Sequence, residues 1–317
     1  MFEDSFQFGN SKITREGAPY FVAEIGLNHN NDLEFGKRTI EAAKNAGAHA
    51  VKFQTYKTAQ FIDSENPKSQ FLIDIFSELE LSPKMHLEFQ KTAKDLGLDF
   101  FSTPLDVSSL HELVSLHVPG IKIASGDITN SELLFAAAQT KLPIFLSTGA
   151  ADFSEVIRAL EYLKDQDVTN LCLFHCISLY PTPTNKVNAM TVKLFSELTD
   201  GPLGFSDHTD GNIAAVLCLA YGASVFEKHF TLDRNAKGPD HSISTDPVGF
   251  RSYVDTLNTA FSMKGTSSKK PNIEEVNGRF WGRRSLYKKD GKWISLRPAM
   301  HLEDDGFFDA WEWVHKK

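Results

Sequence analysis

Residues 202–229 read PLGFSDHTDGNIAAVLCLAYGASVFEKH, and this stretch contains the unit from which the chain is built. Two short apolar runs, Pro202–Ser206 and Ser224–Phe230, flank a segment whose apolar residues recur with helical spacing. Those residues share one face of a predicted helix that opens just after Asp210: Ile213, Val216, Leu217 and Ala220. Strand, helix and strand in this order predict a βαβ unit.

Six further apolar runs with helix-spaced segments between them extend the pattern outward, so the sequence predicts eight strands. In chain order they are Phe21–Ile25, Ala50–Gln54, Asp99–Thr103, Gly120–Ser125, Pro143–Ser147, Asn170–Cys176, Pro202–Ser206 and Ser224–Phe230. Near-continuous apolar runs are typical of parallel strands buried on both faces. Eight βα units in about 265 residues predict a (β/α)8 TIM barrel of the α/β class. The alternative, an open doubly wound sheet, is disfavoured because AEIGLNHN after the first strand is not G-x-G-x-x-G.

Composition limits the class of protein. With 41% hydrophobic and 23% charged residues, the 317-residue chain resembles soluble globular proteins. No apolar run approaches the roughly 20 residues of a membrane helix, and no signal peptide is visible, so we expect a cytoplasmic protein without membrane contact. Three cysteines fit a reducing compartment. A formal net charge of -8 argues against nucleic-acid binding.

Reactive side chains gather where the predicted strands end, which is where (β/α)8 barrels build their active sites. Lys52 and Lys122 end the second and fourth strands, and hydroxyl residues end the third, fourth and seventh: Thr103, Ser125 and Ser206. Two ammonium groups and several hydroxyls suit a phosphate with a neighbouring carboxylate. A single lysine could instead be a Schiff-base nucleophile. Taken one at a time, Gln54, Thr148 and Glu227 are interpreted as hydrogen-bonded polar groups of the barrel interior.

The histidines fall into two groups, which we interpret differently. His49, His86, His111 and His117 lie within or beside helices and are expected at the surface. His208 and His229 end neighbouring strands, and with Glu24 and Asp240 nearby they could hold a divalent metal with open positions. The alternative is a hydrogen-bonded core histidine beside a general base. Cys172 and Cys176 share one strand face and are predicted to be buried apolar residues.

The chain changes character near its C-terminus. KGTSSKKPN is polar and rich in Gly, Ser and Lys, and it predicts a linker over 266–278 after a catalytic barrel over 1–265. The following stretch, 279–297, holds seven basic residues and one acid, with aromatic residues interleaved. In an acidic protein such a segment favours a lid or clamp over an anionic site rather than a nucleic-acid surface.

The strand ends AEIGLNHN, VKFQT, STPLD, IKIASGD, LSTG, HCISLYPTP, GFSDHT, EKHFTLD and KGPDHSISTDP stand in the order found in the sialic acid synthase family, which this chain resembles over roughly residues 15–265. That family condenses phosphoenolpyruvate with an N-acyl amino sugar to a nine-carbon 2-keto sugar acid and phosphate. The resemblance implies a (β/α)8 barrel, Mn²⁺ or Mg²⁺ as cofactor, and a homodimer. The acceptor could resemble N-acetylmannosamine, or could be a di-N-acetylated 6-deoxyhexose, as in legionaminic and pseudaminic acid synthases. A non-catalytic carbohydrate-binding barrel is the reading from another class.

The resemblance also implies residue roles. Phosphoenolpyruvate would contact Lys52, Thr103, Lys122, Ser125, Ser178 and Ser206. His208 and His229 match the metal ligands. Glu24, Tyr180 and Asp240 match residues around the acceptor or the attacking water, and Asp127 stands where members carry Asp or Glu.

The C-terminus departs from the family pattern. Members usually append an antifreeze-like domain that crosses the dimer and contributes an arginine to the acceptor. Here 279–317 resembles a truncated form of that domain, with an Arg-Pro pair, Arg297 and Pro298, like its arginine motif, and the resemblance ends after Ala299. The segment could therefore act as a shortened clamp through Arg297, or could only stabilise its own barrel.

Overall fold

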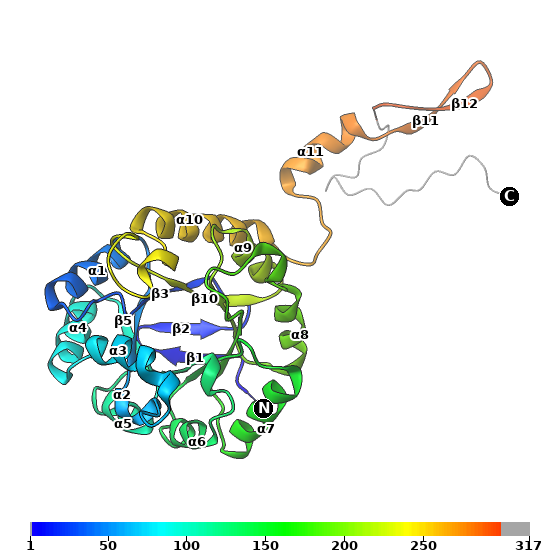
Figure 1. Cartoon of the computed structure of the whole chain (residues 1–317). Coiled ribbons are helices and arrows are strands. Elements are labelled where there is room, and N and C mark those ends of the chain that lie inside the picture. Colours follow the sequence, from blue (N-terminus) through cyan, green and yellow to red (C-terminus); the bar gives the residue numbers. More distant parts are fainter. Residues whose placement is uncertain (1, 299–317) are drawn as a thin grey trace. The chain divides into compact units, whose positions relative to one another are not determined.

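In a computed structural model, which describes residues 2–298, eight parallel strands close into a barrel (Figure 1). Each strand pairs with the next along the chain, and the last pairs with the first. They are β3 (Tyr20–Gly26), β4 (Ala50–Thr55), β5 (Asp99–Pro104), β6 (Ile121–Ile123), β7 (Ile144–Ser147), β8 (Leu171–Cys176), β9 (Leu203–Asp207) and β10 (Ala223–His229). The predicted (β/α)8 barrel is confirmed.

Helices surround the barrel, as Figure 1 shows, and each strand is followed by one that covers it. They are α1 (Leu33–Asn45), α4 (Pro83–Asp95), α5 (Val107–Ser115), α6 (Ser131–Gln139), α7 (Phe153–Asp165), α8 (Met190–Leu198), α9 (Ile213–Ala220) and α10 (Pro247–Lys264). Several begin at side chains that accept a hydrogen bond from the first turn: Asp32, Ser82, Asp106, Asn130 and Asp152. Short polar residues at the N-caps thus start these helices.

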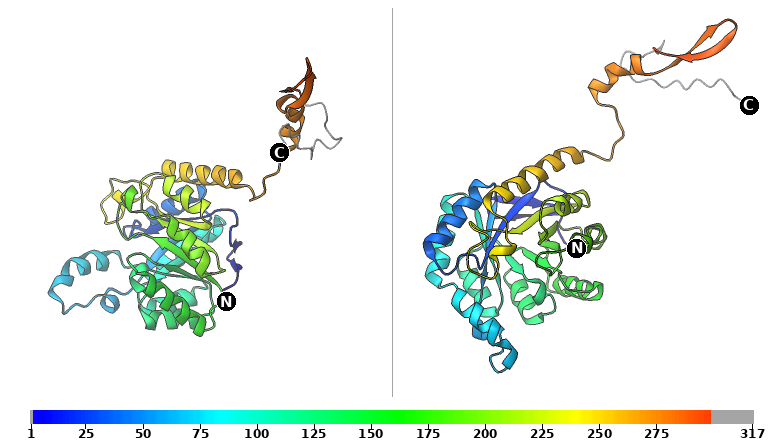
Figure 2. Two further views of the ribbon diagram at one scale, coloured as in Figure 1. Left: turned by 90° about the vertical axis from the view of Figure 1, so that its right-hand side faces the viewer. Right: turned by 45° about the horizontal axis from the view of Figure 1, so that its top comes forward.

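One end of the barrel is closed by a hairpin that the sequence patterns did not predict. Strands β1 (Ser5–Phe8) and β2 (Ser11–Thr14) are antiparallel and lie across this end, which we call the floor (Figure 2). Gly9 forms the turn with a φ of +53°, and a Cβ there would lie 1.9 Å from an Asp99 side-chain oxygen, so only glycine fits. The hairpin inserts Phe8 into the barrel, where its ring centre lies 4.8 Å from that of Phe145 and 5.1 Å from that of Phe101.

The opposite end, the mouth, receives the loops that follow the strands. Between β4 and α4 the chain makes an excursion through α2 (Thr58–Phe61) and α3 (Gln70–Leu79), which extends beyond the barrel at this end (Figure 2). The predicted strand Gly120–Ser125 is too long, because β6 ends at Ile123 and Ser125–Asp127 form a 3-10 turn. That turn is closed by a hydrogen bond from the Asp127 amide to the Ala124 carbonyl, at 3.0 Å.

Residues from 265 onward form a second compact unit. Its described part contains helix α11 (Ile273–Gly282) and an antiparallel hairpin of β11 (Ser285–Lys289) and β12 (Lys292–Leu296). The linker predicted at 266–278 therefore includes the first half of α11. Residues 299–317, the rest of the predicted clamp segment, lie outside the described residues. Within residues 2–298, no helix has both the length and the apolar character that a bilayer crossing requires.

Candidate functional site at the barrel mouth

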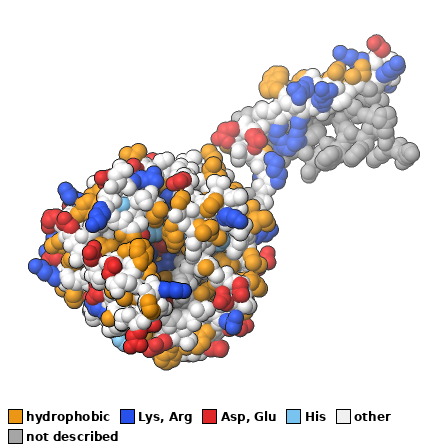
Figure 3. All heavy atoms as spheres, viewed as in Figure 1, with side chains coloured by type: hydrophobic (Ala, Val, Ile, Leu, Met, Phe, Trp, Pro, Cys, Tyr) orange, Lys and Arg blue, Asp and Glu red, His pale blue; other side chains and the backbone are white. Residues whose placement is uncertain are grey.

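A cavity of about 210 Å³ opens at the mouth and is lined by residues from the ends of all eight barrel strands. Figure 3 shows the hollow at the centre of this face, with basic side chains in and beside it. Ten of the residues singled out from the sequence line the cavity: Glu24, Lys52, Thr103, Lys122, Ser125, Ser178, Tyr180, Ser206, His208 and His229. The structure therefore brings together most of the predicted site.

The two predicted lysines meet at one carboxylate. Lys122 Nζ donates to Glu227 Oε2 at 2.7 Å, and Lys52 Nζ lies 3.7 Å from the same oxygen. All three side chains are buried. Burial alone would raise the pKa of Glu227, but Lys122 and Lys52 outweigh it and lower that pKa to about 2. Glu227 is therefore ionised at neutral pH and holds the two ammonium groups side by side.

Glu24 forms the second carboxylate of this cluster. Its Oε2 lies 2.8 Å from Lys52 Nζ, and its side chain is 2% exposed. Burial raises the pKa of Glu24 despite the neighbouring Lys52. Burial would lower the pKa of Lys52, but the Glu227 and Glu24 carboxylates reverse this and raise it. A proton is therefore easier to place on Glu24 than to remove from Lys52, which suits Glu24 as a group that accepts a proton.

Hydroxyl groups complete the lysine cluster. Lys52 Nζ donates to Thr103 Oγ1 at 2.9 Å, and Lys122 Nζ lies 3.4 Å from Ser206 Oγ. Ser206 in turn donates to Glu227 Oε1 at 3.0 Å. Ser125 Oγ accepts from the Gly149 amide at 2.9 Å and lines the same cavity. Ammonium and hydroxyl groups, the donor types that bind small anions, thus converge on one cavity beside the Glu24 and Glu227 carboxylates.

The two predicted metal ligands lie close together at one side of the cavity. The ring centres of His208 and His229 are 5.6 Å apart. His208 Nδ1 donates to the Ile177 carbonyl at 2.8 Å, which leaves Nε2 with a free lone pair. His229 Nδ1 is buried without a hydrogen-bond partner, and Asp240 Oδ2 lies 3.8 Å from it. Burial, followed by the charge of His229, lowers the pKa of His208 to about 3, so this imidazole is neutral.

This arrangement fits a divalent ion shared by two imidazoles. Metal–nitrogen bonds of roughly 2.1 Å place the ring centres of two ligands about 5–6 Å apart. The separation of 5.6 Å between His208 and His229 lies within this range. Within residues 2–298 no group of three or more His, Cys, Asp or Glu side chains is arranged to hold a metal. If His208 and His229 held a metal, the two imidazoles would fill only two of its positions.

Tyr180 and Ser178 reach the cavity from the loop after β8. The Tyr180 ring lies 4.1 Å from the His208 ring and 6.0 Å from the His229 ring, and its side chain is half exposed. Burial of its hydroxyl raises the pKa of Tyr180, so this phenol keeps its proton. Ser178 is exposed and lines the cavity beside Ser125. Both can therefore contact a ligand in the mouth.

Three predicted residues do not line this cavity: Asp240, which lies beside His229, and Asp127 and Arg297, which lie elsewhere. Asp127 accepts from Asn130 at 3.2 Å and lines a neighbouring cavity of about 560 Å³, which shares Leu105, Ala124 and Gly126 with the mouth. Burial raises the pKa of Asp127. Arg297 is exposed at the end of the hairpin in the second unit.

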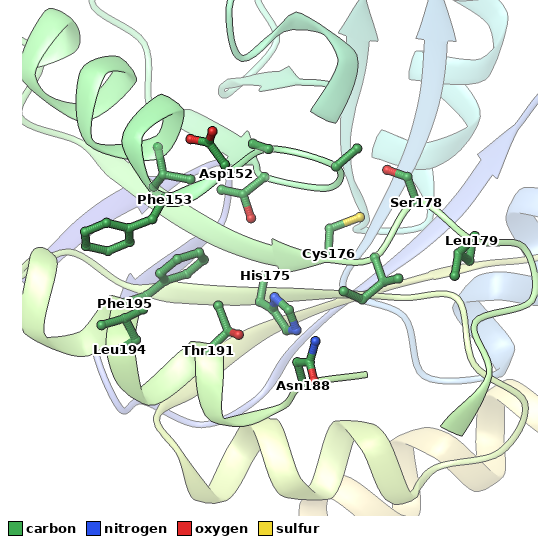
Figure 4. A pocket seen from close by; sticks show the side chains of 15 residues that line it. Asp152, Phe153, His175, Cys176, Ser178, Leu179, Asn188, Thr191, Leu194 and Phe195 are labelled. Carbon is green, nitrogen blue, oxygen red and sulfur yellow. The ribbon is translucent and has the colours of Figure 1, made fainter. Parts of the chain in front are cut away.

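A second neighbouring cavity, of about 480 Å³, lies between β8, α7 and α8 (Figure 4). In this view Phe153 and Phe195 lie at one end, and Cys176 and Ser178 lie at the other. Cys176 is buried as predicted, yet it also lines the mouth, and its Sγ is 4.0 Å from His208 Nδ1. Burial raises the pKa of Cys176, so it presents a neutral thiol. Cys172 packs in the apolar interior of the barrel.

Sequence reasoning missed the role of Glu227 and misplaced one histidine. Glu227 shares its strand face with His229, and this period-two alternation was the signal that could have placed it in the mouth. His86 was expected at the surface but is fully buried, because its Nε2 bonds Thr55 Oγ1 at 2.9 Å and Nδ1 lies 3.2 Å from Glu112.

Comparison with known proteins identifies the family. The sequence profile of the NeuB family matches residues 39–269. The chain belongs to the NeuB family. A relative from Legionella pneumophila, N,N'-diacetyllegionaminic acid synthase, is 37% identical over 84% of this chain and 79% of its own. N-acetylneuraminate-9-phosphate synthase from Drosophila melanogaster is 34% identical over 75% of this chain and 67% of its own.

A solved structure agrees with this assignment. N-acetylneuraminic acid (sialic acid) synthetase from Leptospira borgpetersenii superposes with a TM-score of 0.80 at 32% identity, over 87% of this chain and 96% of its own. The resemblance to sialic acid synthases noted from the strand ends is confirmed. The chain is therefore an enzyme of the NeuB family, a synthase of the transferase type, and the reading as a non-catalytic barrel is set aside.

Proposed function

We propose that this NeuB-family enzyme condenses phosphoenolpyruvate with an N-acyl amino sugar, giving a nine-carbon 2-keto sugar acid and inorganic phosphate. The observation that carries the proposal is the buried pair of ammonium groups, Lys52 and Lys122, which meet at Glu227 within one small cavity. Phosphoenolpyruvate carries a phosphate and a carboxylate on adjacent atoms. Two fixed cations with hydroxyl donors around them match that charge pattern.

In the proposed complex Lys52, Lys122, Thr103, Ser206, Ser125 and Ser178 hold the phosphate and carboxylate. C3 of phosphoenolpyruvate forms a bond to the aldehyde carbon of the open-chain sugar, and positive charge develops at C2. The anionic groups already held beside C2 stabilise this charge. Water then adds at C2. One of its protons passes, by way of a carboxylate, to the alkoxide on the former aldehyde oxygen. The other leaves with phosphate as the C–O bond breaks and the 2-keto group forms. No covalent bond to the protein is needed, so neither lysine has to act as a nucleophile.

We propose Mn²⁺ or Mg²⁺ as the cofactor, held by His208 and His229. When bound there, the ion supplies Lewis-acid polarisation of the aldehyde oxygen. The proton lost by the attacking water goes to a nearby carboxylate, for which Glu24 and Asp240 are the two candidates. Glu24 lies beside Lys52, and Asp240 lies beside His229. Tyr180, over the His208 ring, would contact the acceptor.

The acceptor has two candidates. An N-acetylmannosamine-like sugar is the first, and a di-N-acetylated 6-deoxyhexose is the second. The second is favoured by the Legionella relative, which is named for N,N'-diacetyllegionaminic acid and has a higher identity than the named N-acetylneuraminate-9-phosphate synthase, at 37% against 34%. Asp127, in the cavity beside the mouth, would bind acceptor hydroxyl groups that extend beyond the central cavity.

The proposed enzyme is a homodimer in the cytoplasm. The basic stretch 279–297 of one subunit would approach the anion-filled mouth of its partner, where Arg297 would contact the acceptor. This assignment rests on charge, because the stretch carries seven basic residues and one acid in a protein with a net charge of -8.

Release of inorganic phosphate tests the proposal. The purified enzyme is incubated with phosphoenolpyruvate, Mn²⁺ and each candidate sugar in turn. Phosphate should appear only when all three components are present, and the sugar that supports the fastest release identifies the acceptor. Phosphate release without any sugar would instead indicate a metal-assisted hydrolase and overturn the condensation.

A further inference from the structure

A second buried ion pair lies directly behind the mouth and has no role in the site described so far. Asp207 and Lys228 are 1% and 7% exposed, and Lys228 Nζ lies 3.2 Å from Asp207 Oδ2. Along a strand successive side chains point to opposite faces, so these two point out of the barrel while His208 and His229 point into the mouth. Each charged residue thus directly precedes one of the two histidines.

The pair ties two strand ends together. Asp207 of β9 and Lys228 of β10 are directly paired in the strand register. Lys228 Nζ donates to the Thr209 carbonyl at 2.7 Å, and Asp207 Oδ1 accepts from the Thr209 amide at 2.8 Å and from its hydroxyl at 2.7 Å. These bonds surround His208, because they join the residue before it to the residue after it. The Tyr253 ring of α10 covers Lys228, with its centre 5.1 Å from Nζ.

Stability alone is a poor explanation for this pair. Taking two charges out of water costs several kcal/mol each, and apolar replacements of a buried pair are often neutral or stabilising. What a buried pair with several hydrogen bonds provides is one defined geometry. Here that geometry is the relative position of the backbone at the ends of β9 and β10, which carries His208 and His229.

We propose that the Asp207–Lys228 ion pair is a positioning device for His208 and His229, which sets the separation of their imidazoles for a shared divalent ion. The proposal rests on the metal site of the proposed function. Thr209 is the third member of the device, since its carbonyl accepts a hydrogen bond from Lys228 while its amide and hydroxyl donate to Asp207. Groups that orient metal ligands from behind typically change metal affinity or activity by about 10–100-fold when they are removed.

Mn²⁺ binding without substrates tests this directly, by calorimetric titration of the full-length protein. Lys228→Met should weaken Mn²⁺ binding by about tenfold or more, and Lys228→Arg should restore most of it. Because Lys228→Met leaves a buried carboxylate unpaired, a second variant, Asp207→Asn/Lys228→Met, removes both charges. It should fold with stability near that of the wild type and still bind Mn²⁺ weakly.

Tyr20→Phe is the matched control, because it removes a buried 2.7 Å hydrogen bond to Asp99 at the floor of the same barrel. It should lower the melting temperature and leave Mn²⁺ affinity unchanged. The positioning role would be overturned if folded Lys228→Met and Asp207→Asn/Lys228→Met both bound Mn²⁺ within about threefold of the wild-type affinity. If the wild-type protein bound no Mn²⁺, the metal site of the proposed function would fail first, and this proposal with it.

Discussion

The floor and the mouth of this barrel are made from the same eight strands but have opposite interiors. The floor holds Phe8, Phe101 and Phe145 in edge and tilted contacts beneath a hairpin. The mouth holds two lysines and two glutamates within one cavity. The two meet at Phe174, whose ring centre lies 4.2 Å from Lys122 Nζ. Apolar packing at the floor therefore stabilises the fold and offsets the free-energy cost of the charges buried at the mouth.

Loss of the metal or of its ligands should have the largest effect on activity and should leave the fold intact. Chelator should abolish turnover and Mn²⁺ should restore it, because His208 and His229 would lose their ion. His208→Ala and His229→Ala should each remove measurable phosphate release, while circular dichroism remains that of the wild type. His111→Ala, on the exposed face of α5, serves as the control and should stay active. Full activity in chelator would take the metal out of the proposed function.

The lysine pair should give the next largest effect. Lys52→Ala and Lys122→Ala each remove a charge-assisted contact of about 1.5–3 kcal/mol, which corresponds to about tenfold to over a hundredfold in affinity. We expect KM for phosphoenolpyruvate to rise far more than KM for the sugar. Lys37→Ala, which removes a surface pair with Glu88, should change neither. Borohydride trapping of a substrate on Lys52 or Lys122 would instead establish a Schiff-base aldolase.

The floor should respond in the opposite sense. Phe8 is fully buried, and Phe8→Ala is expected to lower the free energy of unfolding by about 3–5 kcal/mol because it leaves a cavity among aromatic rings. KM values of the protein that stays folded should remain close to those of the wild type. Urea denaturation and steady-state kinetics measure the two quantities, with Phe135→Ala, 47% exposed on α6, as the control. A large change in KM would show that floor and mouth are coupled.

Acid should weaken the mouth end through buried histidines. Burial lowers the pKa of His86 to about 4, below its ordinary value of 6.5. The unfolded chain therefore binds more protons below about pH 6.5, and the stabilisation is lost as pH falls from there toward 4. His86→Gln should reduce the slope of unfolding free energy against pH by up to about 1.4 kcal/mol per pH unit. Denaturation between about pH 7 and 5 measures this slope, and an unchanged slope in His86→Gln would contradict the assignment.

The smallest effect is expected for Arg297, whose substitution tests whether a residue outside the barrel contacts the acceptor sugar. Arg297 is exposed in its own unit, so Arg297→Ala should leave the melting temperature nearly unchanged. A clamp role predicts a raised KM for the sugar, because an arginine contact to its acyl or hydroxyl groups would be lost. Lys292→Ala, in the same hairpin, tests whether charge alone suffices. An unchanged KM would leave the hairpin as a structural element.

Much of this molecule was predictable, for a physical reason. Parallel strands buried on both faces leave long apolar runs, so the ends of all eight strands could be placed to within two residues. Polar residues at the ends of such runs pointed to the mouth. The partners within the mouth could not be predicted, because Glu227 contacts Lys122 across the barrel, 105 residues away. The hairpin β1–β2 was missed because two strands of four residues carry too little periodicity.

The paired state of Lys122 has a consequence for turnover. Its ammonium group donates to Glu227 at 2.7 Å, so under the proposed function a phosphate at Lys122 would compete with a carboxylate that the protein itself supplies. That competitor is tethered, and dilution does not reduce its local concentration. The same carboxylate that weakens the capture of substrate would hasten the departure of product, because it replaces the outgoing phosphate at the lysine. Such a site would shorten the time for which phosphate stays bound and would favour faster turnover. The Glu227→Gln variant should therefore release phosphate more slowly.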